Sequence, residues 1–488
     1  MSEQVQKAKP NGFKLNYKRT FIIGFAFFGI LLMWQVWDSY CSSFLSELFM
    51  NAFGTTESTE VQWLVGIMMA IDNLAALILM PIFGKLSDKT NSKIGKRMPY
   101  ILVGTFVCAV AFPFIPVAFH YNSLVTLILL MVVTVTFAMM YRNPAVALMP
   151  DLTPKPLRSR ANGIINIMGY IGGAVPTVLG IFLVLTKYFT LTEGSEWQYH
   201  NLWVIEIPFL LASVLMVVSV LVLFFLIKEN KVKEEIKEDL EAGEKEAEIA
   251  DSVEDDNEKP MSKANKTMLI LILVAEFFWF MADNGVSTFL TNYTRYHLQA
   301  STGSLSINTI VSGLMSVVGF ATAGMIVKKL GRKWTLTIGL LLTVLSYVVW
   351  VILSFAMPPK EPIVDPITGT VTLNAFPVYM FILFAVKGYA MSLVHVNSFP
   401  MVVELCSARK IGQFTGYYYA SSMLAQTITP CTIGLLMLNP SFGFELLPVY
   451  AVGCMVVSAI VFFFVKNVRL NKTKDDVKVG LDAIGDND

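Results

Sequence analysis

The sequence is poor in charged residues. Asp, Glu, Lys and Arg make up only 15% of the 488 residues, whereas 55% are hydrophobic. A soluble domain cannot bury that much apolar surface in one core, so the composition indicates a membrane protein. The five cysteines form no Cys-x-x-Cys pair, and no HExxH, GxSxG or Cys/His cluster occurs. These absences argue against a disulfide framework, a metal site, a bound cofactor and an enzyme.

Twelve apolar segments are each about 20 residues or longer, the length that an α-helix needs to cross a bilayer. They cover residues 19–42, 62–84, 99–119, 123–149, 163–187, 203–227, 267–290, 304–327, 334–356, 375–403, 412–437 and 445–465. The sequence therefore predicts an all-α membrane protein with twelve transmembrane helices. The first segment has no small-residue cleavage site, so we expect a retained helix and not a signal peptide.

Lysine and arginine are concentrated in alternate loops. If the N-terminus is cytoplasmic, 32 of the 37 cations fall in cytoplasmic segments, and the outer loops hold only Lys187, Arg295 and Lys360. The positive-inside rule then places both termini in the cytoplasm, and we expect a multi-pass protein of the plasma membrane, such as a bacterial inner membrane. Because the cations are confined to these loops, the net charge of +1 gives no support for nucleic-acid binding.

A short motif occurs twice, 240 residues apart. The first copy reads GKLSDKTNSKIGKR from Gly84 to Arg97, and the second reads GMIVKKLGRK from Gly324 to Lys333. In both copies a glycine ends one apolar run, and a Gly-basic-basic turn precedes the next. The repeat indicates two related halves that contain the same helix-loop-helix corner.

The charged stretch between the sixth and seventh spans separates these halves. The predicted units are a cytoplasmic N-terminal segment (1–18), a first six-helix bundle (19–227), a charged cytoplasmic linker (228–266), a second six-helix bundle (267–465) and a cytoplasmic tail (466–488). The linker has many charges and no aromatic residue. It is interpreted either as a solvated segment with some helix or as a regulatory docking segment.

Both corners resemble the loop signature of the major facilitator superfamily. With Pro99 and Tyr100, the first corner looks like the form found in sucrose-type and other glycoside-pentoside-hexuronide cation symporters. The segments Asn143–Asn162 and Val396–Leu405 extend the resemblance over the whole membrane domain. It implies the major facilitator fold, with two pseudo-symmetric bundles whose first and fourth helices line a central cavity. It also implies cation-coupled symport of a sugar by alternating access, most simply of a disaccharide or glycoside such as sucrose or maltose.

Two departures from the resemblance bear on mechanism. Plant-type sucrose carriers have an arginine two residues after the proline that corresponds to Pro144, where this chain has Val146 and places Arg142 two residues before the proline. The melibiose-type branch has sodium-site aspartates at the positions of Met80 and Ala76. The second departure favours a proton over sodium as the coupling cation.

Ionisable residues inside the predicted spans mark the transport pathway, because an ion in hydrocarbon costs several kcal/mol and needs a partner or water. A sugar site needs aromatic planes for its C–H faces and polar groups for its hydroxyls. We therefore expect substrate binding by Trp34, Asp38, Arg142, Asn143, Trp279, Asp283, Lys387 and Asn397. For proton coupling the candidates are Asp38, Asp72, Glu276 and Asp283, in no order.

Other roles for these residues stay open at this stage. A tryptophan near a helix end is often an interfacial anchor, which applies to Trp34 and Trp279. Arg142 and Lys387 are alternatively counter-ions of Asp72 or Glu276. His395 is interpreted either as a packing residue or as a proton carrier.

The charged corners predict gates at the inner helix ends. The expected gating residues are Gly84, Asp88, Arg97, Asp151, Arg158, Gly324 and Arg332. Networks of this kind hold one of two states whose energies differ by only a few kcal/mol. Because Lys328 stands where the second corner would have a counterpart of Asp88, the gate chemistry is predicted to be asymmetric.

The expected partners are a small-molecule sugar, a coupling cation and the lipid bilayer, with the protein acting as a monomer. An exporter or facilitator of another small metabolite or drug on the same fold is the alternative function. Residues 169–180 contain several glycines but lack the GPxxGG-like pattern of antiporters. The sequence therefore favours uptake.

Overall fold

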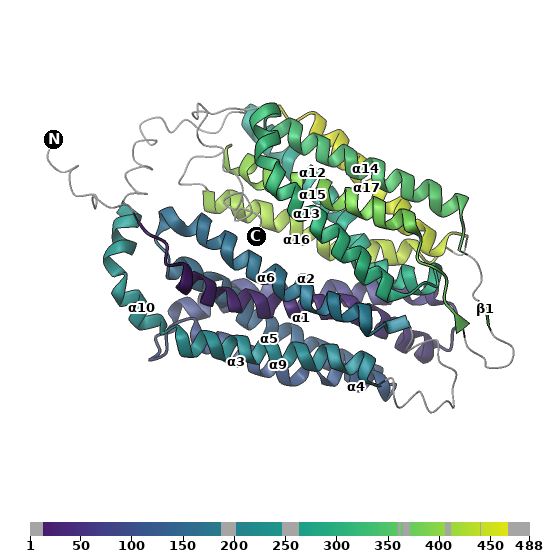
Figure 1. Ribbon diagram of the computed structural model, residues 1–488, viewed down its shortest axis with the longest axis horizontal. Helices are drawn as coiled ribbons and strands as arrows, with labels where there is room; N and C mark the ends of the chain where they lie inside the picture. Colours follow the sequence, from purple (N-terminus) through teal and green to yellow (C-terminus); the bar gives the residue numbers. More distant parts are fainter. Residues whose placement is uncertain are drawn as a thin grey trace.

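The computed structural model describes residues 13–186, 202–245, 263–359, 363–364, 371–405, 411–439 and 441–466. This part of the chain consists mainly of helices joined by loops, with one small antiparallel hairpin, in which β1 (Ile363–Val364) pairs with β2 (Val371–Thr372). Figure 1 shows two groups of long helices side by side, the N-terminal half in purple to teal and the C-terminal half in green to yellow. The predicted all-α fold with two bundles is therefore confirmed, with the hairpin as a minor exception.

Each bundle contains six long helical segments. The first comprises α1 (Tyr17–Phe53), α2 (Gln62–Lys89), α3 (Met98–Ala111) with α4 (Phe114–His120), α5 (Leu124–Asp151), α6 (Arg158–Phe182) and α9 (Leu202–Leu226). The second comprises α12 (Lys263–Asn292), α13 (Thr302–Leu330), α14 (Arg332–Ala356), α15 (Val378–Val403), α16 (Ile411–Leu436) and α17 (Leu446–Phe463). Short 3₁₀ turns occur at Ser58–Val61, Lys155–Leu157 and Gly443–Glu445, and a π-helical turn, η3, at Tyr293–His297.

Every predicted span coincides with one of these segments. Among the described residues, eleven helices are long and apolar enough to cross a membrane. The remaining segment, α16, has 26 residues but is rich in Ser, Thr, Gln and Tyr, which lowers its hydropathy. The third span is α3 and α4 together, interrupted at Pro113, which lacks the N–H that a continuous helix would use.

The linker helix α10 (Glu229–Glu235) and the hairpin lie at opposite ends of the molecule (Figure 1). We call these ends the linker end and the hairpin end. The bundles contact each other through α1 with α12, α2 with α16, and α6 with α13. The predicted units 1–18, 228–266 and 466–488 fall in part outside the described residues, at 1–12, 246–262 and 467–488.

The first helix is longer than its sequence predicted. The expected span ended at residue 42, whereas α1 continues to Phe53 and has 37 residues, about 55 Å at the usual rise. The expected end was wrong because Ser42, Ser43, Ser46 and Glu47 look like loop residues. The side chains of Ser43, Ser46 and Glu47 are instead hydrogen-bonded, to Asn292, to the Ser42 carbonyl and to Tyr296.

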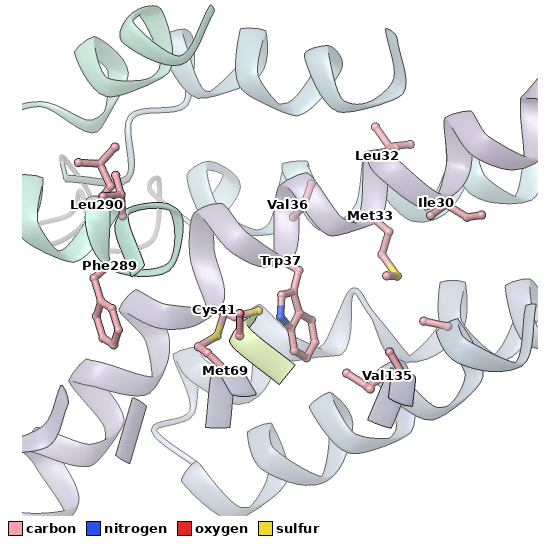
Figure 2. Close-up of a cluster of buried hydrophobic side chains, with 14 of the residues drawn as sticks. Ile30, Leu32, Met33, Val36, Trp37, Cys41, Met69, Val135, Phe289 and Leu290 are labelled. Carbon is pink, nitrogen blue, oxygen red and sulfur yellow. The ribbon is translucent and has the colours of Figure 1, made fainter. Parts of the chain in front are cut away.

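Apolar side chains of α1 fill the core of the first bundle. Figure 2 shows Trp37 and Cys41 beside Met69 of α2, and Val135 of α5 facing the same cluster. Trp37 is 1% exposed and Cys41 is fully buried. Cys108 and Cys454 are buried and Cys431 is half-buried, all as free thiols, as expected for small packing residues, while Cys406 lies outside the described residues.

The two corner motifs adopt related backbones with different lengths. Gly95 and Gly331 both have positive φ, +116° and +82°, so each needs a residue without a side chain to turn the chain. Eight residues separate α2 from α3, whereas Gly331 alone separates α13 from α14. The repeat therefore preserves the turn glycine, and the longer first corner adds the residues that contact the linker.

Candidate functional site

Three charged residues meet in the first bundle. Asp38 lies midway along α1, Asp72 near the centre of α2 and Arg142 in α5. The two carboxylates interact electrostatically, and Arg142 interacts with Asp72. The Asp72 Oδ1 accepts hydrogen bonds from the backbone N–H and the side-chain amide of Asn73, at 2.6 and 2.9 Å. Asp38 is exposed, whereas Asp72 is buried. Of the two acids, Asp72 is therefore the one with a nearby cation.

An ion pair occupies the second bundle. Asp283 of α12 pairs with Lys387 of α15, and His395 of α15 interacts electrostatically with both charges. The side chains of Asp283 and Lys387 are 30% and 18% exposed, so the pair is partly accessible. The imidazole of His395 lies 5.6 Å from the ring of Phe280, edge to face. The structure thus pairs Lys387 with Asp283, whereas the sequence suggested Asp72 or Glu276 as its counter-ion.

Glu276 lies apart from both groups. Its side chain is fully buried in α12, and neither carboxylate oxygen has a hydrogen-bond partner within the described part of the chain. The hydroxyl of Tyr418, on α16, interacts electrostatically with it. A buried charge without a partner is costly, which makes Glu276 unusual among the acids of the second bundle.

The tryptophan and asparagine side chains that we expected to bind substrate differ in their burial and hydrogen bonding. Trp34 is half-buried and Trp279 is fully buried, and no hydrogen bond to either indole N–H occurs among the described residues. Asn143 donates to the carbonyl of Met80 at 2.5 Å and so joins α5 to α2. Asn397 is fully buried and donates to its own helix. Trp279 and Asn397 are therefore inaccessible to a ligand in this conformation.

Arg97 organises the charges of the first corner. Its guanidinium lies 2.8 Å from Asp151, 2.5 Å from Asp88 and 2.5 Å from the Ser87 hydroxyl, and Lys96 lies 3.0 Å from Asp151. Burial disfavours the Arg97 cation, but the hydrogen bond and charge of Asp151, with those of Asp88, outweigh burial and raise its pKa. The structure therefore brings three predicted gating residues into one contact network at the linker end.

The second corner has a simpler version of this network. Arg332 lies 2.9 Å from Glu404 at the end of α15, as Arg97 lies beside Asp151 at the end of α5. The sequence singled out Arg332 and missed Glu404. The signal was present, because Glu404 belongs to the segment 396–405 that carried part of the family resemblance.

The remaining predicted gating residues have packing or capping contacts. A Cβ atom on Gly84 would lie 2.4 Å from the Asn143 amide nitrogen, so Gly84 permits the close approach of α2 and α5. Gly324 is buried in α13. Arg158 donates to the carbonyls of Pro150 and Thr153 at 3.0 and 3.2 Å. Burial lowers the pKa of Arg158, and nearby acidic charges, which act to raise this pKa, only partly offset the effect.

Sequence reasoning missed the residue that fastens the linker. The Glu229 carboxylate accepts hydrogen bonds from the backbone N–H groups of Lys96, Arg97 and Met98, at 2.9 to 3.3 Å. These groups belong to the N-terminus of α3, where a carboxylate is favoured by the unpaired donors and the helix dipole. Gly95 leaves room for it, because a Cβ atom there would lie 2.1 Å from a Glu229 oxygen. The beginning of the linker is therefore docked on the first bundle.

Asp88→Asn should impair transport while the protein still inserts. An amide in place of the carboxylate removes the ion pair with Arg97 but leaves the contact of Arg97 with Asp151. Because the Asp88 side chain is 58% exposed, we expect a loss of about 1 kcal/mol in the state shown and little change in stability. Uptake and surface expression would be measured together, with Lys93→Gln as the matched loop control. Normal uptake by a well-expressed Asp88→Asn protein would refute a gating role.

Comparison with known proteins decides the family. The family model described as Major Facilitator Superfamily matches residues 20–364 and 272–483, and so spans most of the chain. The chain belongs to the major facilitator superfamily. Members of this superfamily are transporters, so the charged groups described above lie in the membrane part of a major facilitator transporter.

Solved structures of major facilitator transporters share its fold. The inward-open xylose transporter XylE from E. coli superimposes with a TM-score of 0.62 at 15% identity, covering 94% of this chain and 98% of that one. A bacterial homologue of the human lysosomal transporter Spinster, inward-facing and occupied, gives 0.62 at 14% identity, covering 93% and 97%. At these identities the likeness concerns the fold alone.

One curated relative matches over a short segment. The general alpha-glucoside permease of Schizosaccharomyces pombe (strain 972 / ATCC 24843) is 34% identical over 82 residues. The match covers 16% of this chain and 13% of the permease, so it compares only a small part of each protein.

Proposed function

We propose that this major facilitator transporter is a symporter that couples the uptake of a sugar, of the disaccharide or glycoside class, to the entry of a proton. The observation that carries the proposal is the set of charged residues inside the spans, Asp38, Asp72 and Arg142 in one bundle and Asp283 with Lys387 in the other. Such groups are expensive in a membrane unless they serve ions or substrate. The short likeness to an alpha-glucoside permease supports a sugar as the substrate.

The coupling site of the proposal is the acidic group of the first bundle. Asp38 and Asp72 repel each other when both are ionised, and Arg142 interacts with Asp72, so a proton bound by one of the two acids would relieve the repulsion before the site moves across the membrane. A C–H face of the sugar would stack on Trp34, and its hydroxyls would bind the Asp283–Lys387 pair; these side chains are partly accessible. Sodium is disfavoured as the coupling ion, because Ala76 and Met80 replace the carboxylates of a melibiose-type sodium site.

We further propose that the linker end faces the cytoplasm, in the plasma membrane, and that the protein acts as a monomer. The cation-rich corners, with Arg97 and Arg332, lie at this end. Among the described residues, hydrogen bonds between the bundles occur at the opposite end, for example between Ser43 and Asn292 and between Thr186 and Thr302. With this orientation the conformation is inward-facing, and alternating access would open the hairpin end to the outside.

Purified protein in liposomes tests the function. A panel of disaccharides and glycosides would be offered with and without an inward proton gradient, while sugar uptake and internal pH are both followed. We expect one sugar to accumulate only with the gradient and to carry protons inward. Sugar movement without any proton flux would contradict symport, and movement only outward, or of non-sugar compounds, would support the exporter or facilitator alternative.

A further inference from the structure

A buried polar cluster joins the two bundles at the hairpin end. Asn292, the last residue of α12, inserts its amide into a socket formed by Ser42, Ser43 and Ser46 of α1 and Gln62 of α2. The Asn292 Oδ1 accepts from the Ser43 hydroxyl at 2.8 Å, and its Nδ2 donates to the Ser46 hydroxyl and the Gln62 side-chain Oε1 at 3.0 and 3.1 Å. Each of these five side chains is 0% exposed. Ser42 contributes its backbone carbonyl, which accepts from Asn292 Nδ2 at 3.4 Å, so one side chain of the second bundle is bonded to two helices of the first.

An ion pair covers this cluster on the side nearer the end of α1. Arg295, in the π-helical turn η3, pairs with Glu47 of α1, which also accepts a hydrogen bond from the Tyr296 hydroxyl at 2.9 Å. The Arg295 guanidinium also lies 4.5 Å from the centre of the Tyr296 ring. Arg295 and Glu47 are 8% and 23% exposed, so this second contact lies closer to solvent than the Asn292 cluster.

Close backbone contacts flank the socket. A Cβ atom on Gly66 of α2 would lie 2.0 Å from the carbonyl oxygen of Pro430, and one on Gly434 of α16 would lie 2.6 Å from the carbonyl oxygen of Gln62. On the other side, a Cβ atom on Gly303 of α13 would lie 3.2 Å from the carbonyl oxygen of Ile181. Such contacts fix the two bundles tightly, so Asn292 can only leave its socket if the bundles separate.

Hydrogen bonds suit a contact that must form and break repeatedly. When the bundles part, water can replace every donor and acceptor of the socket, so the net change per hydrogen bond is small. When the bundles are together, an unpaired amide or hydroxyl would be buried without a partner, which is costly. The cluster therefore favours complete closure or complete opening over intermediate positions.

We propose that Asn292 and its socket form the latch that holds the hairpin end closed, and that release of this latch opens the substrate site on that side. The inference rests on the proposed alternating-access function and assigns the residue that holds one of its two states. Asn292 acts as a positioning residue, because it sets the relation of the bundles without contact to the predicted substrate groups.

The latch can be tested through the distance between the bundles. Spin labels would replace Tyr121 of the first bundle and Met357 of the second, both exposed at the hairpin end, after the native cysteines are changed. Asn292→Leu should raise about tenfold the fraction of molecules in which the two spin labels are far apart. This is the effect expected for the loss of one to two hydrogen bonds. The matched control is Asn308→Leu, since Asn308 is equally buried in the second bundle but has no hydrogen-bonded amide atom among the described residues.

The measurement does not depend on sugar, so it separates failure of the latch from failure of the transport proposal. Gln62→Leu tests the same socket from α2 and replaces Asn292→Leu if that protein does not insert. An unchanged distance distribution in the inserted variants would overturn the latch. An equal opening in Asn308→Leu would do so as well, because it would show general loosening of the bundles. Opening confined to the socket variants is the expected result.

Discussion

Replacing Asp72 with asparagine should abolish sugar accumulation driven by a pH gradient while leaving exchange of labelled for unlabelled sugar. The amide keeps the shape of the carboxylate but cannot load and release a proton at this position. It also removes the electrostatic interactions of Asp72 with Asp38 and Arg142. The substrate groups of the second bundle are unchanged, so the bundles can still carry sugar in both directions.

The expected effect is large. With a gradient of two pH units, one-to-one coupling sustains about 100-fold accumulation, since each unit corresponds to about 1.4 kcal/mol. Asp72→Asn should reduce this ratio to about one at any external pH. Glu206→Gln provides the control, because Glu206 is a half-buried carboxylate of α9 outside the predicted site. If the Asp72→Asn protein still concentrates sugar in response to external acid, Asp72 is not the coupling residue.

Lys387→Met should abolish uptake and also destabilise the protein. The change leaves Asp283 in α12 without its ion-pair partner, next to His395. Breaking a buried pair by removing one partner costs about 3 to 5 kcal/mol, and the partial exposure of this pair places the expected loss at the lower end, about 3 kcal/mol. Thermal unfolding in detergent and uptake in liposomes would measure the two effects.

A double variant separates stability from function. Asp283→Asn combined with Lys387→Met removes both charges, so it should recover most of the thermal stability that Lys387→Met loses. Uptake should stay at background, because the proposed hydrogen-bonding groups for sugar hydroxyls are still missing. A Lys387→Met protein as stable as wild type would show that the ion pair is not structurally important, and active transport by the double variant would exclude the pair from the substrate site.

The membrane topology could be predicted because the bilayer imposes a simple rule on sequence. A helix that crosses hydrocarbon needs about 20 apolar residues, and this signal survives one proline or several buried polar groups. The third span was therefore recognised although Pro113 divides it, and α16 although its composition is polar. Helix ends were less accurate, since the polar residues that follow Cys41 are paired by another helix, a contact that is not visible in one segment.

Charged residues inside the spans were predicted, but their partners were not. An ion in a helix stands out from its apolar neighbours, so Asp72, Arg142 and Lys387 could be found from sequence. Which of them pair depends on the rotation and spacing of helices far apart in the chain. The structure places Arg142 near Asp72 and joins Lys387 to Asp283, whereas Glu276 has neither cation as a partner. The roles of these residues in transport stay predictions.

Two contacts left almost no signal in the sequence. Glu229 is one acid among many in a charged linker, and only the free N–H groups at the start of α3 distinguish it. Asn292 is a neutral residue near a helix end, where an asparagine attracts no attention. Both residues act through partners more than 130 positions away in the chain. A pattern within one segment cannot reveal such pairs.

The continuity of α1 has a mechanical consequence. Between Asp38 and Phe53 the helix contains neither glycine nor proline, so this stretch of about 22 Å behaves as a stiff rod. Asp38 and Ser43 lie on this rod, about 7.5 Å apart along its axis. A tilt of about 5° around Asp38 would therefore move Phe53 by about 2 Å and Ser43 by about 0.7 Å, as calculated from the helix rise. A tilt of α1 at the level of Asp38 would therefore reach the Ser43–Asn292 hydrogen bond through the helix itself, with no relay of side chains between them.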